Sequence, residues 1–136
     1  MEDSIFTKII KGEIPCHKIY EDEHVLAFLD ILPAQPGHTL VIPKRQVEFV
    51  WDLPDDSYAA LRDAVKKVAN QLRAKSGKTY VGELIIGLDV PHAHINLVPF
   101  DTSEELDNAF HKDKDSEPDH TALAAMAERL RMEDAA

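Results

Sequence analysis

The stretch Pro91-His92-Ala93-His94-Ile95-Asn96-Leu97-Val98-Pro99-Phe100 decides the fold that we expect for this chain. Its polar side chains, His92, His94 and Asn96, share one parity, and apolar residues occupy the positions between them. Successive side chains of a β-strand point to opposite faces of its sheet. The stretch therefore predicts a strand that packs one apolar face on a core and carries two imidazoles and an amide on its other face.

Two imidazoles on one strand face leave three interpretations open. They can be ordinary surface histidines, or zinc ligands that share the metal with a third histidine elsewhere. They can also act in nucleophilic catalysis, because a neutral imidazole is a good nucleophile near pH 7. Asn96 is a poor zinc ligand, and the strand holds no cysteine or acidic residue. The pattern of residues therefore favours catalysis over a metal site.

Composition restricts the partners and the location of the protein. The chain has 136 residues, enough for one domain with a real core, and its net charge of −10 argues against nucleic acid as a partner. A small anionic ligand remains compatible with a locally positive site. Cys16 is the single cysteine, so no internal disulfide can form. We find no apolar run long enough to span a membrane and no signal peptide, and we expect a cytoplasmic protein without a membrane partner.

Periodicity predicts the remaining elements. Short strands separated by polar turns are expected at residues 18–21, 25–30, 38–43 and 79–86, besides the strand at 91–100. Helices are expected at residues 1–11, 54–76 and 121–131, and the longest of them has one apolar stripe. Residues 101–119 are polar and acidic and predict a loop. The fold class is α+β: one domain over residues 1–136, with a five-stranded antiparallel sheet packed on one long helix.

Three separated blocks carry a resemblance to a known family. The first is His92-Ala93-His94-Ile95-Asn96-Leu97-Val98. The second joins Phe28-Leu29-Asp30-Ile31 to Pro36-Gly37-His38-Thr39-Leu40-Val41-Ile42-Pro43-Lys44, and the third is Ser4-Ile5-Phe6-Thr7-Lys8-Ile9-Ile10-Lys11-Gly12-Glu13-Ile14-Pro15. In this order they resemble the histidine triad (HIT) family, whose signature is His-φ-His-φ-His-φ-φ, and in particular a Hint-like bacterial branch. Asn96 stands in the place of the third histidine.

The resemblance implies a HIT-like fold and roles for named residues. His94 would be the nucleophile, His92 would orient the phosphate, and His38 would join the polar cluster and move protons. Asn96 would donate a hydrogen bond to a phosphoryl oxygen. The nucleotide would be bound by Asp30 at the ribose hydroxyls and by an apolar purine pocket, formed by Ile5, Phe6, Ile9, Phe28 and Ile31. HIT proteins are usually homodimers whose two sheets join, and we expect a homodimer here.

Two departures from the family change what we expect of the site. Some bacterial members carry a structural zinc on a Cys-x-x-Cys pair, at the positions of Ser4 and Thr7. This chain has neither cysteine, so we expect no zinc there. We also expect no other metal and no cofactor. Asp89 stands where many relatives have a small hydroxyl residue that donates to the substrate. An ionised carboxylate there would contact the nucleotide, repel a second phosphate and attract an amine, although Asp89 can also simply cap the turn before Pro91.

The expected function is hydrolysis at the α-phosphate of a purine nucleotide conjugate, such as a nucleoside 5′-phosphoramidate. A nucleotidyl intermediate on His94 would form and then release a nucleoside monophosphate. Asn96 cannot relay a proton, and the galactose-1-phosphate uridylyltransferase branch of the superfamily has Gln at this place. That branch transfers to phosphate acceptors, so transfer of the nucleotidyl group to a phosphate acceptor remains an alternative here. A nucleotide-binding module with little turnover is a third possibility.

Overall fold

The α+β architecture is confirmed by a computed structural model, which describes residues 2–107 and 116–132. A five-stranded antiparallel sheet has the strand order β1-β2-β3-β5-β4. Its strands are β1 (Lys18–Glu21), β2 (Val25–Leu29), β3 (Thr39–Pro43), β4 (Tyr80–Leu84) and β5 (Ile95–Phe100). The helices are α1 (Ile5–Ile10), the short 3-10 helix η1 (Val50–Asp52), α2 (Asp55–Lys75), α3 (Ser103–Asp107) and α4 (His120–Leu130).

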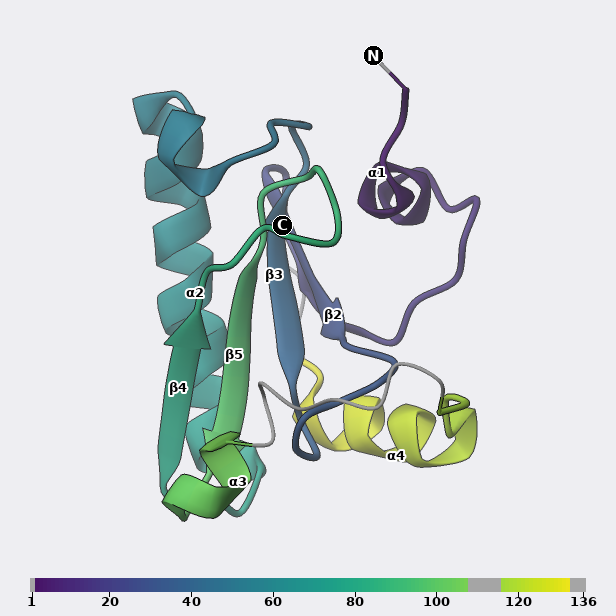
Figure 1. Ribbon diagram of the computed structural model, residues 1–136, viewed down its shortest axis with the longest axis vertical. Coiled ribbons are helices and arrows are strands. Elements are labelled where there is room, and N and C mark those ends of the chain that lie inside the picture. Colours follow the sequence, from purple (N-terminus) through teal and green to yellow (C-terminus); the bar gives the residue numbers. More distant parts are fainter. Residues whose placement is uncertain (1, 108–115, 133–136) are drawn as a thin grey trace.

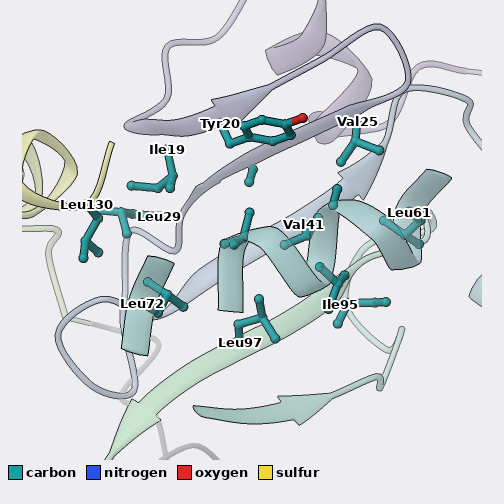
Figure 2. Close-up of a cluster of buried hydrophobic side chains, with 14 of the residues drawn as sticks. Ile19, Tyr20, Val25, Leu29, Val41, Leu61, Leu72, Ile95, Leu97 and Leu130 are labelled. Carbon is teal, nitrogen blue, oxygen red and sulfur yellow. The ribbon is translucent and has the colours of Figure 1, made fainter. Parts of the chain in front are cut away.

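The long helix α2 covers one face of the sheet and forms the main core with it. Figure 2 shows aliphatic side chains of the strands meeting those of α2, with Ile95 and Leu97 of β5 close to α2 and Leu130 of α4 at one end. Ile95 and Leu97 are at most 1% exposed. Full burial of a side chain of this size stabilises the fold by roughly 1.5–3 kcal/mol. The apolar parity of residues 91–100 therefore packs as the sequence predicted.

The opposite face of the sheet packs against α1. Its buried apolar side chains form a second, smaller cluster, which comprises Phe6, Leu26, Phe28, Leu40 and Ile42. Helix α1 begins after Ser4, whose side chain accepts a hydrogen bond from the backbone N–H of Thr7. Gly12, with a positive φ of 80°, follows the end of the helix, as suits a residue without a Cβ. In Figure 1, α1 and the segment leading into β5 lie near one end of the sheet, and α4 lies near the other.

Three boundaries differ most from the prediction, and the others agree to within two residues. Strand β5 begins at Ile95 rather than Pro91, because the backbone N–H groups of His92 and Ala93 donate to Val90 and Val47 instead of to a strand. Helix α1 begins at Ile5 rather than at residue 1, since Ser4 is its cap. Part of the predicted loop 101–119 forms α3, and residues 108–115 of that loop lie outside the described residues.

The helix α3 has a sequence signal that the prediction overlooked. The hydroxyl of Thr102 accepts from the N–H of Glu105, and the Glu105 carboxylate accepts from the N–H of Thr102. This reciprocal pair is a capping box, which satisfies two backbone donors at the start of a helix. The Thr-x-x-Glu spacing therefore predicts a helix start inside a stretch that its acidic composition alone suggests is a loop.

The chain after α4 returns to the first strand. The backbone N–H of Met132 donates to the carbonyl of Ile19, and the side chain of Arg131 reaches the carbonyl of Lys18. These contacts cover part of the outer edge of β1. Among the described residues, β4, at the other end of the strand order, pairs with a strand on one side only. Within residues 2–107 and 116–132, no helix combines the length and the apolar character that crossing a bilayer requires.

Candidate active site

The alternation of three neighbouring strands brings the predicted polar residues to the face that α1 covers. In register, Phe28 pairs with Leu40, and Leu40 pairs with Asn96. Asp30 lies two residues after Phe28, and His38 lies two residues before Leu40. The backbone N–H of Asp30 donates to the carbonyl oxygen of His38 at 2.9 Å. Because side chains of equal parity share a face, the residues predicted from separate blocks meet here.

His92 is completely buried, and protein groups occupy both of its ring nitrogens. Nε2 lies 2.8 Å from the carbonyl oxygen of Pro43, and Nδ1 lies 2.7 Å from Oγ of Ser4. A carbonyl only accepts, so Nε2 carries the proton. Burial lowers the pKa of His92; the carbonyl of Pro43 opposes this effect, and His94 adds to it. The ring is therefore neutral at pH 7, and the Ser4 hydroxyl donates to Nδ1. Protein groups thus engage both ring nitrogens in this arrangement, and the contact of His92 with the phosphate stays a prediction.

His94 is held at one nitrogen only. Its Nδ1 lies 2.7 Å from the carbonyl oxygen of His92, which again requires the proton on Nδ1 and leaves a lone pair on Nε2. Within the described residues, no protein group makes a hydrogen bond to Nε2. The ring is half-buried and meets Phe6 edge to face, with centroids 5.2 Å apart. His94 therefore combines a defined tautomer with an available nucleophilic nitrogen.

His38 and Asn96 form a second polar cluster together with Asp30. Nδ1 of His38 accepts from the backbone N–H of Ala34, and Nε2 donates to Oδ1 of Asn96 over 3.0 Å. The amide nitrogen of Asn96 donates to the carbonyl of Leu84 on β4, at 3.2 Å. The amide therefore braces β5 between His38 and β4. The amide nitrogen carries two hydrogens and gives one of them to Leu84, so the phosphate contact of Asn96 stays a prediction.

Asp30 occupies the loop that follows β2. One carboxylate oxygen accepts from the backbone N–H of Leu32 at 2.9 Å, and the other lies 3.8 Å from Nε2 of His38. The bond to Leu32 caps the turn that follows β2. A carboxylate offers about four acceptor positions, so this bond to Leu32 is compatible with the predicted bond to a ribose.

The predicted purine pocket separates into two parts. Phe6 and Phe28 meet edge to face with centroids 5.6 Å apart, and Ile9 packs on the same cluster. Ile5 and Ile31 are 50% and 47% exposed. Ile31 lines a separate apolar cavity of about 140 Å³ between the loop after β2 and α4, together with Pro33, Pro36, Gly37, Asp119, Ala122, Leu123 and Met126. The α4 side of this cavity was not predicted, because residues 119–126 are 88 to 95 positions from Ile31.

The remaining predicted residue, Asp89, is exposed in the bend between β4 and β5. Its position agrees with both predicted roles, because the same bend leads directly into residues 92–94.

The side chains around Nδ1 of His92 do not form a suitable zinc site. Besides the imidazole they offer the hydroxyl oxygens of Ser4 and Thr7 and the amide oxygen of Gln46. Structural zinc is bound by thiolate, imidazole and carboxylate groups. Across the described residues, no group of three or more His, Cys, Asp or Glu side chains is arranged to hold a metal.

Sequence reasoning missed one partner of His92 and one partner of Ser4. The carbonyl of Pro43 has no side-chain signature, and Gln46 joins the network through the backbone N–H of Ser4, 42 positions away. Ser4 was recognised only as the position of a replaced cysteine. No local pattern indicates these contacts, since each depends on how α1 and the segment after β3 pack together.

Comparisons with known proteins agree with this geometry. The HIT domain model matches residues 11–103. An uncharacterized HIT-like protein of Methanocaldococcus jannaschii is 44% identical over 99 residues, which cover 70% of this chain and 77% of that protein. The adenosine 5′-monophosphoramidase hnt1 of Schizosaccharomyces pombe is 40% identical over 96 residues, covering 70% and 72%.

A solved structure extends the likeness to nearly the whole chain. A HIT-like protein from Bartonella henselae superposes with a TM-score of 0.80 at 28% identity, over 95% of both chains. The family model, the relatives in sequence and the fold thus agree, and this chain belongs to the HIT domain family.

Proposed function

We propose that this protein hydrolyses purine nucleoside 5′-phosphoramidates through a nucleotidyl intermediate on His94. The observation that carries the proposal is the 2.7 Å bond from Nδ1 of His94 to the carbonyl oxygen of His92. It selects the tautomer whose Nε2 lone pair can attack phosphorus. The name of the S. pombe relative, an adenosine 5′-monophosphoramidase, supports this class of substrate.

The reaction divides one difficult displacement into two easier ones. Nε2 of His94 attacks the α-phosphorus, the phosphorus–nitrogen bond to the leaving amine breaks, and the amine takes a proton from water. A second water then attacks the phosphorus and gives its proton to the hydroxide that the first water left, and the bond to His94 breaks. The products are the nucleoside monophosphate and the amine, and His94 is regenerated.

The supporting residues orient the reacting groups and do not transfer protons. Both nitrogens of His38 are bonded to protein groups, so we assign His38 to ordering Asn96 and Asp30 instead of moving protons. The purine lies against the Phe6 and Phe28 cluster, and the Asp30 carboxylate accepts from the ribose hydroxyls. A carboxylate can accept these bonds in addition to the one from Leu32.

The test is to trap the intermediate. Wild-type protein is mixed with an adenosine 5′-phosphoramidate, quenched in cold alkaline buffer within the first turnover, and measured by intact mass. We expect one added adenylyl group on the peptide that contains His94, and none on His94→Ala. An adduct on another residue, or turnover without any adduct on the millisecond scale, would contradict the proposed intermediate.

The same assay distinguishes the alternatives that Asn96 leaves open. Because the Asn96 amide is held by His38 and Leu84, we expect water to remain the acceptor. Pyrophosphate or a sugar phosphate is added to the reaction, and the products are identified by ³¹P NMR. Formation of a nucleoside triphosphate or a nucleotide sugar would instead support a transferase. Tight binding of AMP without turnover would support a binding module.

We also propose that the protein is a homodimer joined along β4. This strand lies at the end of the strand order, with Tyr80 55% exposed, whereas residues 131 and 132 contact the outer edge of β1. An open edge tends to pair with another chain, and obligate dimers commonly bury about 2,000 Å² or more in total. Light scattering at micromolar concentration should give twice the chain mass, and a monomer mass would contradict the proposal.

A further inference from the structure

We propose that Ser4 is a positioning residue for the nucleophile: its hydroxyl holds the ring of His92, and His92 in turn holds His94. This inference rests on the proposed function only for the kinetic effect, because the contacts and their spectroscopic consequences exist without substrate. Ser4 lies 88 positions before His92, at the start of α1.

The first contact in this chain determines the state of His92. Oγ of Ser4 accepts from the backbone N–H of Thr7 at 3.0 Å, and its proton is directed to Nδ1 of His92 at 2.7 Å. The opposite ring nitrogen donates to the carbonyl of Pro43. The ring is therefore bonded at both ends and cannot rotate about χ2 without losing two buried hydrogen bonds.

The second contact transmits this order to the nucleophile. The backbone of residues 92 and 93 is held by His92 N–H to Val90 and by Ala93 N–H to Val47. With the ring and the backbone both held, the carbonyl of His92 has one direction, and it accepts from Nδ1 of His94. Through His92, Ser4 thereby helps to hold Nδ1 of His94, the ring nitrogen that does not attack.

Two further side chains fix Ser4 itself. Oε1 of Gln46 accepts from the backbone N–H of Ser4 at 2.9 Å and from the hydroxyl of Thr7 at 2.6 Å. Ser4 is 6% exposed, and in the described part of the chain no buried side-chain nitrogen or oxygen lacks a hydrogen-bond partner. The network is therefore closed among protein groups, and the 2.7 Å contact with Nδ1 of His92 is the shortest that the Ser4 hydroxyl makes.

The competing explanation is that Ser4 only caps α1. Loss of a cap would loosen α1, which carries Phe6 of the proposed base pocket, and would therefore raise KM. Loss of a positioning contact would lower kcat and would mix the tautomers of His94. The two roles thus predict different measurements for the same variant.

The experiment compares three substitutions of Ser4 in the full-length protein. Ser4→Ala removes the cap and the donor, Ser4→Thr keeps both, and Ser4→Asp keeps the cap but presents only an acceptor to His92. The ring nitrogens of His92 and His94 are followed by ¹⁵N NMR on ligand-free protein, and kcat and KM are measured with an adenosine 5′-phosphoramidate. Thermal unfolding shows which variants are folded.

For Ser4→Ala we expect kcat to fall about tenfold, as expected for the loss of one buried hydrogen bond, with KM within about twofold of wild type. The His94 signals should change from one tautomer to a mixture. Ser4→Thr should restore both readouts, and Ser4→Asp should give a His92 ring protonated at both nitrogens.

Unchanged His94 tautomers in Ser4→Ala, or a raised KM with unchanged kcat, would overturn the positioning role and leave Ser4 as a cap. The NMR readout does not depend on turnover. If His94→Ala retained activity, the proposed mechanism would fail, whereas the link from Ser4 to the His94 ring would still be tested by the spectra.

Discussion

The two faces of the sheet are built from the same strands but carry different kinds of side chain. On the α2 face, β5 contributes Ile95 and Leu97, which need no partner other than packed aliphatic groups. On the α1 face, the segment leading into β5 contributes His92, which is equally buried but has hydrogen bonds from Ser4 and to Pro43. Burial of a polar group is tolerated only when it is hydrogen-bonded. The α2 face therefore supplies stability, and the α1 face holds polar groups in the single arrangement that their partners allow.

The largest expected effect separates chemistry from folding. We expect His94→Ala to lower kcat by at least about 10³-fold, as removal of a covalent nucleophile commonly does, while AMP binding and the free energy of unfolding stay near wild type. His24→Ala is the matched control, because His24 is an exposed turn residue between β1 and β2. Steady-state kinetics and calorimetry measure both effects. Wild-type-like turnover in His94→Ala would remove the chemical role assigned to the α1 face.

The opposite result is expected on the α2 face. Leu97→Ala should lower the free energy of unfolding by about 3 kcal/mol, since a fully buried leucine leaves a cavity when truncated. The folded fraction should keep a kcat within about twofold. Leu88→Ala, at a residue 82% exposed, is the control and should change stability by less than about 0.5 kcal/mol. Urea denaturation measures both. A large loss of kcat in folded Leu97→Ala would show that the faces are not separable.

The buried histidine should make stability depend on pH. Burial lowers the pKa of His92 in the folded state below its ordinary value of 6.5. Between these two pKa values the unfolded chain binds the proton and the folded chain does not, so stability rises with pH there and is lost as pH falls below about 6.5. The slope reaches about 1.4 kcal/mol per pH unit at most. Wild type and His92→Gln are compared by urea denaturation from pH 5 to 8. Parallel curves would show that His92 does not titrate differently on folding.

The smallest expected effect concerns the rim of the site. Asp89 is exposed, so solvent screens its charge, and we expect Asp89→Ser to change substrate preference by about three- to tenfold. A phosphoramidate with a cationic leaving group should lose kcat/KM relative to a dinucleoside polyphosphate. The ratio of the two kcat/KM values is measured in wild type and variant at low and at physiological salt. An unchanged ratio would mean that Asp89 only caps its turn.

Local sequence was sufficient to predict how the sheet and the long helix form the layers of this molecule. The two-residue alternation in residues 91–100 and the apolar stripe of the long helix are properties of the chain alone, because the periods of strand and helix follow from covalent geometry. They predicted which side chains of β5 face α2 and that the two histidines share the other face. They did not predict that β5 begins only at Ile95, because the hydrogen bonds of residues 92 and 93 go to Val90 and Val47.

The roles within the α1 face depended on tertiary structure. By sequence, His92 and His94 are alternate members of one motif, yet packing of α1 buries the first against Ser4 and leaves Nε2 of the second available. His38 and Asn96 meet across 58 positions, and that contact engages an amide to which the family resemblance gave a phosphate contact. A hydrogen bond between distant side chains has no period in the sequence. It forms only where packed elements bring donor and acceptor within about 3 Å, so the sequence by itself determined the candidates, and the fold decided which of them is held and which can react.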